Sequence, residues 1–303
     1  MKSKKSILFI ILFLLASISY FLYNNNNFSF ALEDGSSKFS EDINEELEVY
    51  FLDVGQADSI LIRNKDKNML IDAGNNNDGD YLVSYFKSIG IEKFDYVVGT
   101  HAHEDHIGGM DNIIDNFEIG KFYMPDKITT TKTFRDVLDA LERKQIKFNV
   151  PEIGDELSFG DVNIRVIYVS SDDELNDTSI VLKLIYKDIS MLFMGDASTK
   201  VEEKILLQDL KSDVLKVGHH GSIYSTSEDF IKEVEPKISI IEVGKNNNYG
   251  HPRYEVIERL KNIGSKVFRT DEDGTIKVSS DGEKLKVEFL NTNTDGGSKW
   301  NIL

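Results

Sequence analysis

The sequence predicts an α+β fold in which two β-sheets pack face to face and helices cover the outside. Short apolar, β-branched segments fall into two sets along the chain, with helix-like segments between them. Sheets and helices of this kind bury their apolar faces against one another in layers. No repeat of a fixed short period occurs, and a hydrophobic content of 40% is ordinary for a globular core. One continuous domain is therefore expected in most of the 303 residues.

Residues 1–27 are expected to form a signal peptide or an N-terminal membrane anchor. Three lysines among the first five residues precede an apolar run from Ile7 to Tyr23, which only two serines interrupt. The run approaches the roughly 17–25 residues that span a bilayer. No clear Ala-x-Ala cleavage site is present, so an anchor is favoured over a cleaved signal, and a buried helix of the fold is the remaining alternative. The protein is then expected on the extracellular face of the cell membrane, held by this segment, or secreted.

The domain itself is predicted at residues 47–290, after a linker at 28–46 and before a polar tail at 291–303. Its first three strands are separated by short turns and are expected to be antiparallel. A helix and a further strand follow, and strands alternate with a helix again in the second half. The predicted strands are Glu48–Asp53, Ser59–Arg63, Met69–Asp72, Phe94–Val98, Val162–Val169, Ile180–Tyr186, Met191–Met194, Val214–Val217 and Ile238–Val243, and the predicted helices are Tyr81–Ile89 and Lys200–Leu207.

All six histidines fall into three short segments, and each segment follows a predicted strand. The first segment holds four side chains able to bind a metal within six residues, a density that histidines packed in a core have no reason to show. These candidate residues are His101, His103, Asp105 and His106, then His219 and His220, and finally His251. The pattern predicts a metal site at the C-terminal ends of the strands, where open α/β sheets place their sites.

The candidate ligands predict two divalent ions bound through nitrogen and oxygen. The chain has no cysteine, which removes thiolate ligands and a cysteine nucleophile. Imidazole and carboxylate suit Zn²⁺, Mn²⁺ or Fe; Zn²⁺ is the expected ion and Mn²⁺ the alternative. His101 and His103 are expected to hold one ion, and Asp105 with His106 the second. Asp196 follows a strand and offers a carboxylate suited to bridging two ions about 3.5–4 Å apart.

Several motifs make the chain resemble the metallo-β-lactamase-fold hydrolases. The first histidine segment has the form His-x-His-x-Asp-His, the signature of that family. Leu70–Gly74 is similar to the aspartate turn that supports the metal loop, Phe193–Asp196 to the bridging-aspartate motif, and Val217–Ser222 to the late histidine motif. Phe51–Ser59 and Asn248–Pro252 narrow the resemblance to the hydrolase domain of ComEC-type DNA-uptake proteins and their stand-alone relatives. The resemblance covers the predicted domain and implies a four-layer αββα sandwich.

The resemblance also implies a di-metal hydrolase in which a metal-bound hydroxide attacks the substrate, with phosphodiester cleavage as the leading activity. Following the late histidine motif, His219 is assigned as a ligand of the second metal. His220 would then support this ligand from behind or face the substrate. The alternative is that the two histidines exchange these roles. Asp105 would orient ligands and accept a proton. His251 would contact the substrate or donate a proton to the leaving group.

One departure from the family pattern concerns the first ion. Many relatives carry a histidine on the loop before the strand Ser179–Tyr186, and this chain has none there. An oxygen from Asp173, Asn176 or Asp177, or a water, is expected in its place.

The negative net charge of the chain limits which macromolecules it can bind. The formal net charge of −17 repels phosphate backbones at long range and leaves no basic footprint for duplex nucleic acid. The sequence therefore predicts a secreted or surface-anchored metal-dependent hydrolase that acts on a phosphodiester-containing substrate, with nucleic acid bound only locally at the metals. The alternatives are a hydrolase of another ester (a choline-phosphate ester, a lactone or a β-lactam) and a metal-binding module without turnover. Nothing in the sequence indicates an oligomeric state.

Overall fold

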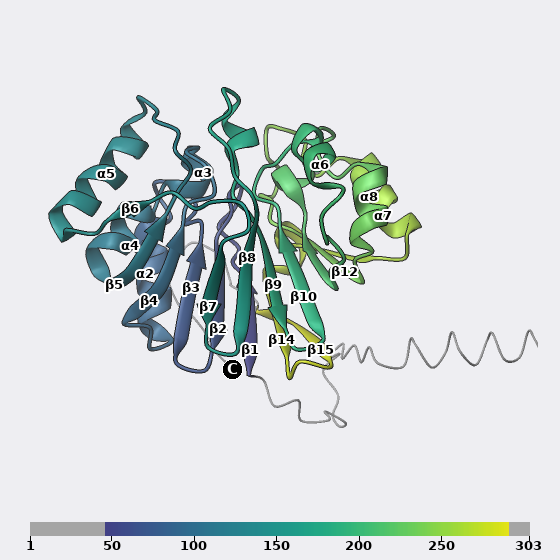
Figure 1. Ribbon diagram of the computed structural model, residues 1–303, viewed down its shortest axis with the longest axis horizontal. Coiled ribbons are helices and arrows are strands. Elements are labelled where there is room, and N and C mark those ends of the chain that lie inside the picture. Colours follow the sequence, from purple (N-terminus) through teal and green to yellow (C-terminus); the bar gives the residue numbers. More distant parts are fainter. Residues whose placement is uncertain (1–45, 291–303) are drawn as a thin grey trace, which may run out of the picture.

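The computed structural model describes residues 46–290, which form two sheets packed face to face with helices on both outer faces (Figure 1). The predicted signal peptide or anchor at 1–27, the tail at 291–303 and all but the last residue of the linker lie outside the described residues. Among the described residues, no helix has the length and apolar character needed to cross a membrane.

The first sheet has eight strands in the order β15-β14-β1-β2-β3-β4-β5-β6. Its strands are antiparallel from β15 to β3, as expected for the first three, and parallel from β3 to β6. The bounds are β1 Leu47–Phe51, β2 Ile60–Asn64, β3 Lys67–Ile71, β4 Lys93–Val98, β5 Glu118–Tyr123, β6 Phe148–Asn149, β14 Thr275–Ser280 and β15 Leu285–Leu290.

The second sheet has seven strands in the order β13-β12-β11-β10-β9-β8-β7. It repeats the plan of the first, because β7 to β10 are antiparallel and β10 to β13 are parallel. The bounds are β7 Glu156–Phe159, β8 Val162–Tyr168, β9 Val181–Tyr186, β10 Ile189–Phe193, β11 Val214–Lys216, β12 Ile238–Ile241 and β13 Lys266–Arg269.

The core follows from the alternation of side chains along each strand. In β1, Val49 and Phe51 point into the space between the sheets, where Phe51 stacks on Phe193 with ring centroids 6.3 Å apart. Tyr50 points to the opposite face and joins the cluster under the helices of the first sheet. Because neighbouring residues of a strand face opposite sides, a strand that is apolar throughout must be covered on both faces, and the helices provide the second cover.

Helices α2, α4 and α5 cover the first sheet, and α6, α7 and α8 cover the second (Figure 1). This arrangement confirms the predicted four-layer sandwich. The bounds are α2 Gly79–Ser88, α3 Glu104–Ile107, α4 Met110–Asn116, α5 Lys132–Lys144, α6 Thr199–Ile205, α7 Glu228–Val234, α8 Tyr254–Asn262 and α9 Thr270–Asp273, with 3-10 turns η1 Leu175–Thr178 and η2 Gly218–Gly221.

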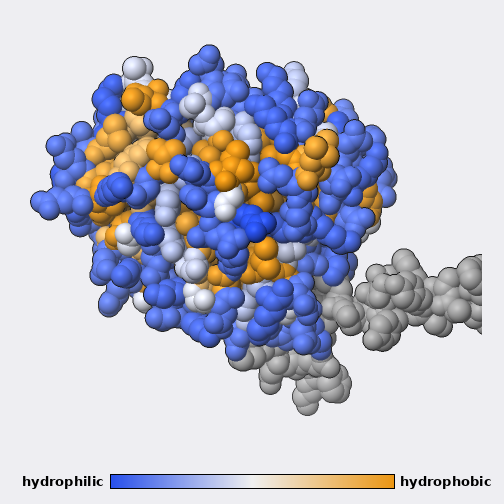
Figure 2. Space-filling model, in the orientation of Figure 1, coloured by the Kyte–Doolittle hydropathy of each residue, from blue (hydrophilic) through white to orange (hydrophobic). Residues whose placement is uncertain are grey.

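The face of the protein drawn in Figure 2 is mostly polar. Hydrophilic residues cover most of its area and apolar residues form several separate patches. This pattern agrees with the high content of charged residues, 29% of the chain.

Candidate metal centre

The loop after β4 carries the first histidine segment, and Asp72 holds it in place. Asp72 follows β3 with a positive φ of 60°. Its Oδ1 accepts a hydrogen bond from the backbone N–H of Thr100, and its Oδ2 accepts one from the Thr100 hydroxyl, both at 2.7 Å. The same Oδ2 lies 2.7 Å from Nδ1 of His106. This contact fixes the imidazole so that Nε2 of His106 points away from Asp72 and toward Asp196.

Two glycines let this loop pack directly on the aspartate turn. Gly108 donates its N–H to the carbonyl of Gly74 at 2.8 Å. A Cβ atom at Gly108 would lie 2.1 Å from the carbonyl carbon of Asn75, and one at Gly109 would lie 2.6 Å from the carbonyl oxygen of Ala73. Only glycine therefore permits this approach, and the metal loop and the turn form one rigid unit.

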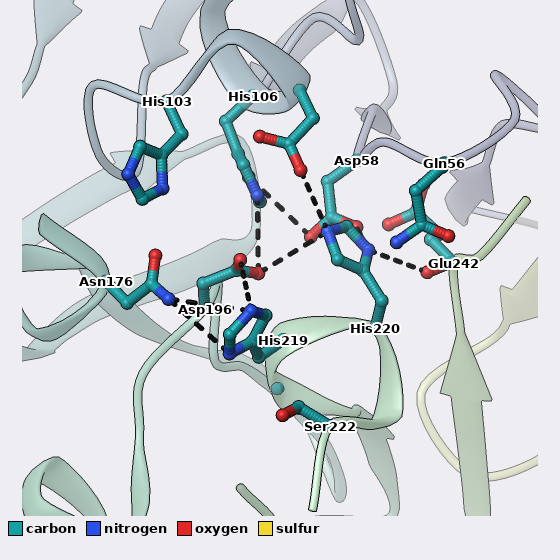
Figure 3. Close-up of polar contacts among 12 residues, drawn as sticks. Gln56, Asp58, His103, His106, Asn176, Asp196, His219, His220, Ser222 and Glu242 are labelled. Carbon is teal, nitrogen blue, oxygen red and sulfur yellow. Dashed lines mark hydrogen bonds and ion pairs between the residues drawn. The ribbon is translucent and has the colours of Figure 1, made fainter. Parts of the chain in front are cut away.

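Asp196 lies between the two groups of histidines (Figure 3). It follows β10 through Gly195, whose φ is +53°, and its backbone N–H donates to the Ser179 hydroxyl at 3.1 Å. Its Oδ1 lies 3.3 Å from Nε2 of His106. The carboxylate is almost fully buried, at 2% exposed for the residue, so the second sheet presents it to the loop of the first.

His219 and His220 both follow β11, but they point to different places. Both residues adopt the left-handed backbone conformation, with φ of 48° and 50°. Nε2 of His220 lies 3.3 Å from Oδ2 of Asp105 and 3.8 Å from Oδ1 of Asp196. His219 turns toward the pocket instead, with a quarter of its side chain exposed. The structure thus has the alternative order of these two residues, because His220 and not His219 lies beside Asp105.

Four residues form a cluster with the composition of a metal site. One ligand atom from each of Asp105, His106, Asp196 and His220 lies within 4.8 Å of the others. Nε2 of His106, Nε2 of His220 and Oδ1 of Asp196 are buried and have no hydrogen-bond partner. Buried polar atoms are seldom left unsatisfied, and two imidazole nitrogens facing carboxylate oxygens match the preferences of a borderline divalent ion. The residues therefore fit the ion that the sequence predicted.

His101 and His103 lie beside this cluster. Nε2 of His101 is 3.0 Å from Nδ1 of His103 and 4.0 Å from Oδ2 of Asp196. Burial, followed by the neighbouring His106, lowers the pKa of His101 well below its usual value, which favours the neutral imidazole that metal binding requires.

Of the three residues expected to replace the missing histidine, only Asn176 lines the pocket. Asp173 is fully exposed and pairs with Lys127 at 3.1 Å. Asp177 is buried, and its Oδ1 accepts a hydrogen bond from the backbone N–H of Ser198. Asn176 lies on η1, with its amide nitrogen 3.5 Å from the His219 ring.

Behind the cluster lies a buried group of charges that the sequence analysis did not assign. Nζ of Lys216 is 2.7 Å from Oδ2 of Asp58 and 3.8 Å from Oε2 of Glu242, and none of the three side chains is more than 1% exposed. Burial alone would lower the pKa of Lys216, but Asp58 and Glu242 raise it above its usual value. Burial and the nearby Asp58 raise the pKa of Glu242 well above its usual value.

This group supports the site from behind. Oδ1 of Asp58 lies 3.3 Å from Nδ1 of His220, and the same Nδ1 is 2.9 Å from the Glu242 carbonyl oxygen. With Nδ1 engaged in this way, Nε2 is the nitrogen left to face the cluster. A lysine in the short apolar strand β11 was the available signal for this group, because a charge inside a buried strand needs a partner.

Three residues of the cluster, Asp105, Asp196 and His220, line a pocket of about 390 Å³, a size ordinary for small-molecule sites. Neither lysine nor arginine is among the lining residues, which include Gln56, Asn75, Glu104, Asn176, Tyr249 and His251 beside the cluster. Burial lowers the pKa of His251 to about 4, and His219 and His220 add to the effect. The Tyr249 and His251 rings stack at 5.9 Å with an interplanar angle of 17°.

Comparison with known proteins agrees with this fold. A family model described as "Metallo-beta-lactamase superfamily" matches residues 52–244, more than half of the chain. The chain belongs to the metallo-beta-lactamase superfamily. The superfamily assignment and the His/Asp cluster together identify it as a metal-dependent hydrolase.

Within the superfamily, the chain is similar to several bacterial proteins, among them "Competence protein ComA" of Neisseria gonorrhoeae, at 26% identity over 244 residues that cover 78% of this chain and 33% of the relative. It is 30% identical over 257 residues to "ComE operon protein 3" of Bacillus subtilis, covering 78% of this chain and 33% of the relative. It is 28% identical over 249 residues to "Recombination protein 2" of Haemophilus influenzae, covering 80% of this chain and 30% of the relative. The chain therefore spans about a third of the length of these relatives, and the expected ComEC-type resemblance is confirmed.

Solved structures share the fold at low identity. CmlA, a diiron β-hydroxylase from Streptomyces venezuelae, aligns with a TM-score of 0.55 and 13% identity, over 78% of this chain and 54% of that one. The metallo-beta-lactamase fold protein YhfI from Bacillus subtilis aligns with a TM-score of 0.53 and 12% identity, over 76% of this chain and 99% of that one. At these identities the likeness concerns the fold alone.

Proposed function

We propose that this metallo-beta-lactamase-fold protein hydrolyses phosphodiester bonds with two divalent ions, Zn²⁺ or Mn²⁺. The observation that carries the proposal is the buried cluster around Asp196. Nε2 of His106, Oδ1 of Asp196 and Nε2 of His220 have no hydrogen-bond partner, and Asp196 and His220 line an open pocket. Divalent ions held there would supply Lewis-acid chemistry, neutralising phosphate charge and activating water. No serine or cysteine nucleophile is needed for this chemistry.

The protein's own residues provide positioning. Asp72 and the Glu242 carbonyl oxygen hold the Nδ1 sides of His106 and His220, so both rings keep their Nε2 atoms directed at the cluster. Asp105 contacts His220 on the same side and is close enough to orient it or to accept a proton. His251 also lines the pocket, with its ring centroid 5.6 Å from that of His219, and its imidazole would contact the substrate there.

Charge and relatives favour a small or single-stranded phosphodiester. Because no lysine or arginine lines the pocket, the ions must provide the positive charge that a phosphate requires. A net charge of −17 disfavours long duplex DNA. Relatives named for competence and recombination are connected with DNA, which favours a nucleic-acid strand over a phosphate ester of another kind.

A substrate panel tests this proposal. The purified full-length chain is stripped with a chelator, reloaded with Zn²⁺ or Mn²⁺, and assayed on bis(p-nitrophenyl) phosphate and a single-stranded oligonucleotide. p-Nitrophenyl phosphate, a choline-phosphate ester, a lactone and a β-lactam complete the panel. We expect metal-dependent turnover of the diesters at rates at least 10-fold above those of the other compounds. Faster turnover of another ester would replace the proposal, and metal binding without any turnover would make the protein a binding module.

We also propose that the domain faces the outside of the cell, on the membrane or secreted. The support is the lysine-rich start followed by the apolar run from Ile7 to Tyr23. Protease added to intact cells should digest the domain while a cytoplasmic marker survives. Protection of the domain until the cells are broken would contradict this location.

A further inference from the structure

Each carboxylate oxygen of Asp196 faces its own pair of imidazole rings. Oδ1 lies 3.3 Å from Nε2 of His106 and 3.8 Å from Nε2 of His220. Oδ2 lies 3.6 Å from Nε2 of His219 and 4.0 Å from Nε2 of His101. Asp196 therefore separates two sets of nitrogen atoms, and His219 and His220, although adjacent in sequence, belong to different sets.

The backbone explains how consecutive residues reach both sets. His219 and His220 both have φ near +50°, a conformation that few residues other than glycine adopt and that needs support from its surroundings. It is fixed here because the His219 N–H donates to the Gly195 carbonyl at 3.0 Å and the Ser222 N–H donates to the His219 carbonyl at 2.8 Å. The turn thus delivers one imidazole to each side of Asp196.

The first ion, on the His219 side of Asp196, lacks one of the protein ligands that the family pattern supplies. His101 and His103 supply two nitrogens, 3.0 Å apart, and Asp196 supplies Oδ2. The loop before β9 has no histidine, and its Asn176 reaches only to within 3.5 Å of the His219 ring. Oδ1 of Asn176 is buried and has no hydrogen-bond partner, and Figure 3 shows the Asn176 amide between His103 and His219.

We propose that His219 completes the first ion's ligand set, in place of the histidine missing before β9, with Asn176 beside it. The first ion would take His101, His103, His219 and Oδ2 of Asp196, a four-ligand nitrogen-rich set of the kind Zn²⁺ accepts. The second would take Asp105, His106, His220 and Oδ1 of Asp196. This inference rests on the two-ion part of the proposed function, but its test counts ions and needs no substrate.

Metal stoichiometry of the full-length chain provides the first test. The stripped protein is titrated with Zn²⁺ or Mn²⁺ alone, and bound metal is measured by mass spectrometry and calorimetry. Wild type should bind two ions, whereas His219→Ala should keep one and bind the other at least 10-fold more weakly. His219→Gly controls for misfolding, because glycine adopts a positive φ without strain. It should show the same weakened binding of one ion as His219→Ala. His251→Ala, which changes a neighbouring imidazole, should still bind two ions.

A rescue experiment assigns the lost ion to the first site. Asn176→His puts an imidazole on the loop before β9, at the one of the three candidate positions that lines the pocket. Combined with His219→Ala, it should restore two-ion binding, but combined with His220→Ala it should not. The proposal is overturned if His219→Ala and His219→Gly bind two ions with wild-type affinity, or if His251→Ala loses an ion that they retain. Rescue of His220→Ala instead of His219→Ala would also overturn it. These results do not depend on which bond the enzyme cleaves.

Discussion

Replacement of Lys216 by methionine should strongly destabilise the protein. Lys216 and Asp58 are at most 1% exposed, and their charged atoms are 2.7 Å apart. Methionine fills much of the same volume but leaves the Asp58 carboxylate buried beside Glu242 without its cation. Breaking a buried pair in this way typically costs about 3–5 kcal/mol of unfolding free energy. In a domain of this size each kcal/mol corresponds to roughly 2–4 °C in Tm, so a decrease of more than about 6 °C is expected.

Urea unfolding of the chelator-treated full-length chain, followed by circular dichroism, measures the effect. Lys232→Met is the matched control, because Lys232 is 60% exposed and lies 3.9 Å from Glu228; such a surface pair contributes about 0.5 kcal/mol or less. Adding Asp58→Asn to Lys216→Met should recover part of the loss, since the uncompensated charge is then removed. If Lys216→Met lost less than about 1 kcal/mol, the buried group would not be a coupled ion pair and this reasoning would fail.

Three further predictions concern the site and its loops. Asp196→Ala should abolish hydrolysis and release bound metal, whereas His251→Ala should lower turnover and leave the amount of bound metal unchanged. Circular dichroism should show a native fold in both variants. Wild-type turnover in Asp196→Ala would refute the two-ion site. Gly108→Ala should lower the unfolding free energy by about 1–3 kcal/mol through overpacking, because its Cβ would meet Asn75 at 2.1 Å; an unchanged urea midpoint would contradict this. Affinity for a single-stranded oligonucleotide should fall less than about 10-fold between 50 and 200 mM salt, and a steep fall would reveal a basic channel.

The sequence was sufficient for most strands that carry site residues, because their apolar runs end at the functional motifs. The predicted strand Phe94–Val98 differs from β4 by one residue, and Ile180–Tyr186 differs from β9 likewise. The last two strands of the first sheet were not predicted. Of these two strands β14 pairs with β1, with Val278 opposite Val49. This pairing joins segments more than 200 residues apart, which no local pattern encodes.

The candidate site was predicted in composition but not in arrangement. Spacing alone identified the histidine segments and Asp196, whereas the directions of His219 and His220 depend on two positive φ angles that a sequence does not display. The buried Lys216 group was missed for a similar reason, because Lys216 and Asp58 are 158 residues apart. Only the packing of the two sheets brings these side chains together.

The candidate ligands come from both sheets of the sandwich, so a cut of the chain between them divides the metal site. The loop of the first sheet carries His101 to His106, and the second sheet carries Asp196, His219 and His220. Residues 150–155 connect β6 to β7 on the surface, with Val150 46% and Ile153 56% exposed. A chain cut there would yield two fragments that each hold an incomplete set of ligands. Their reassembly would then respond to divalent ions, so the fold offers a natural place to build a split sensor for metal.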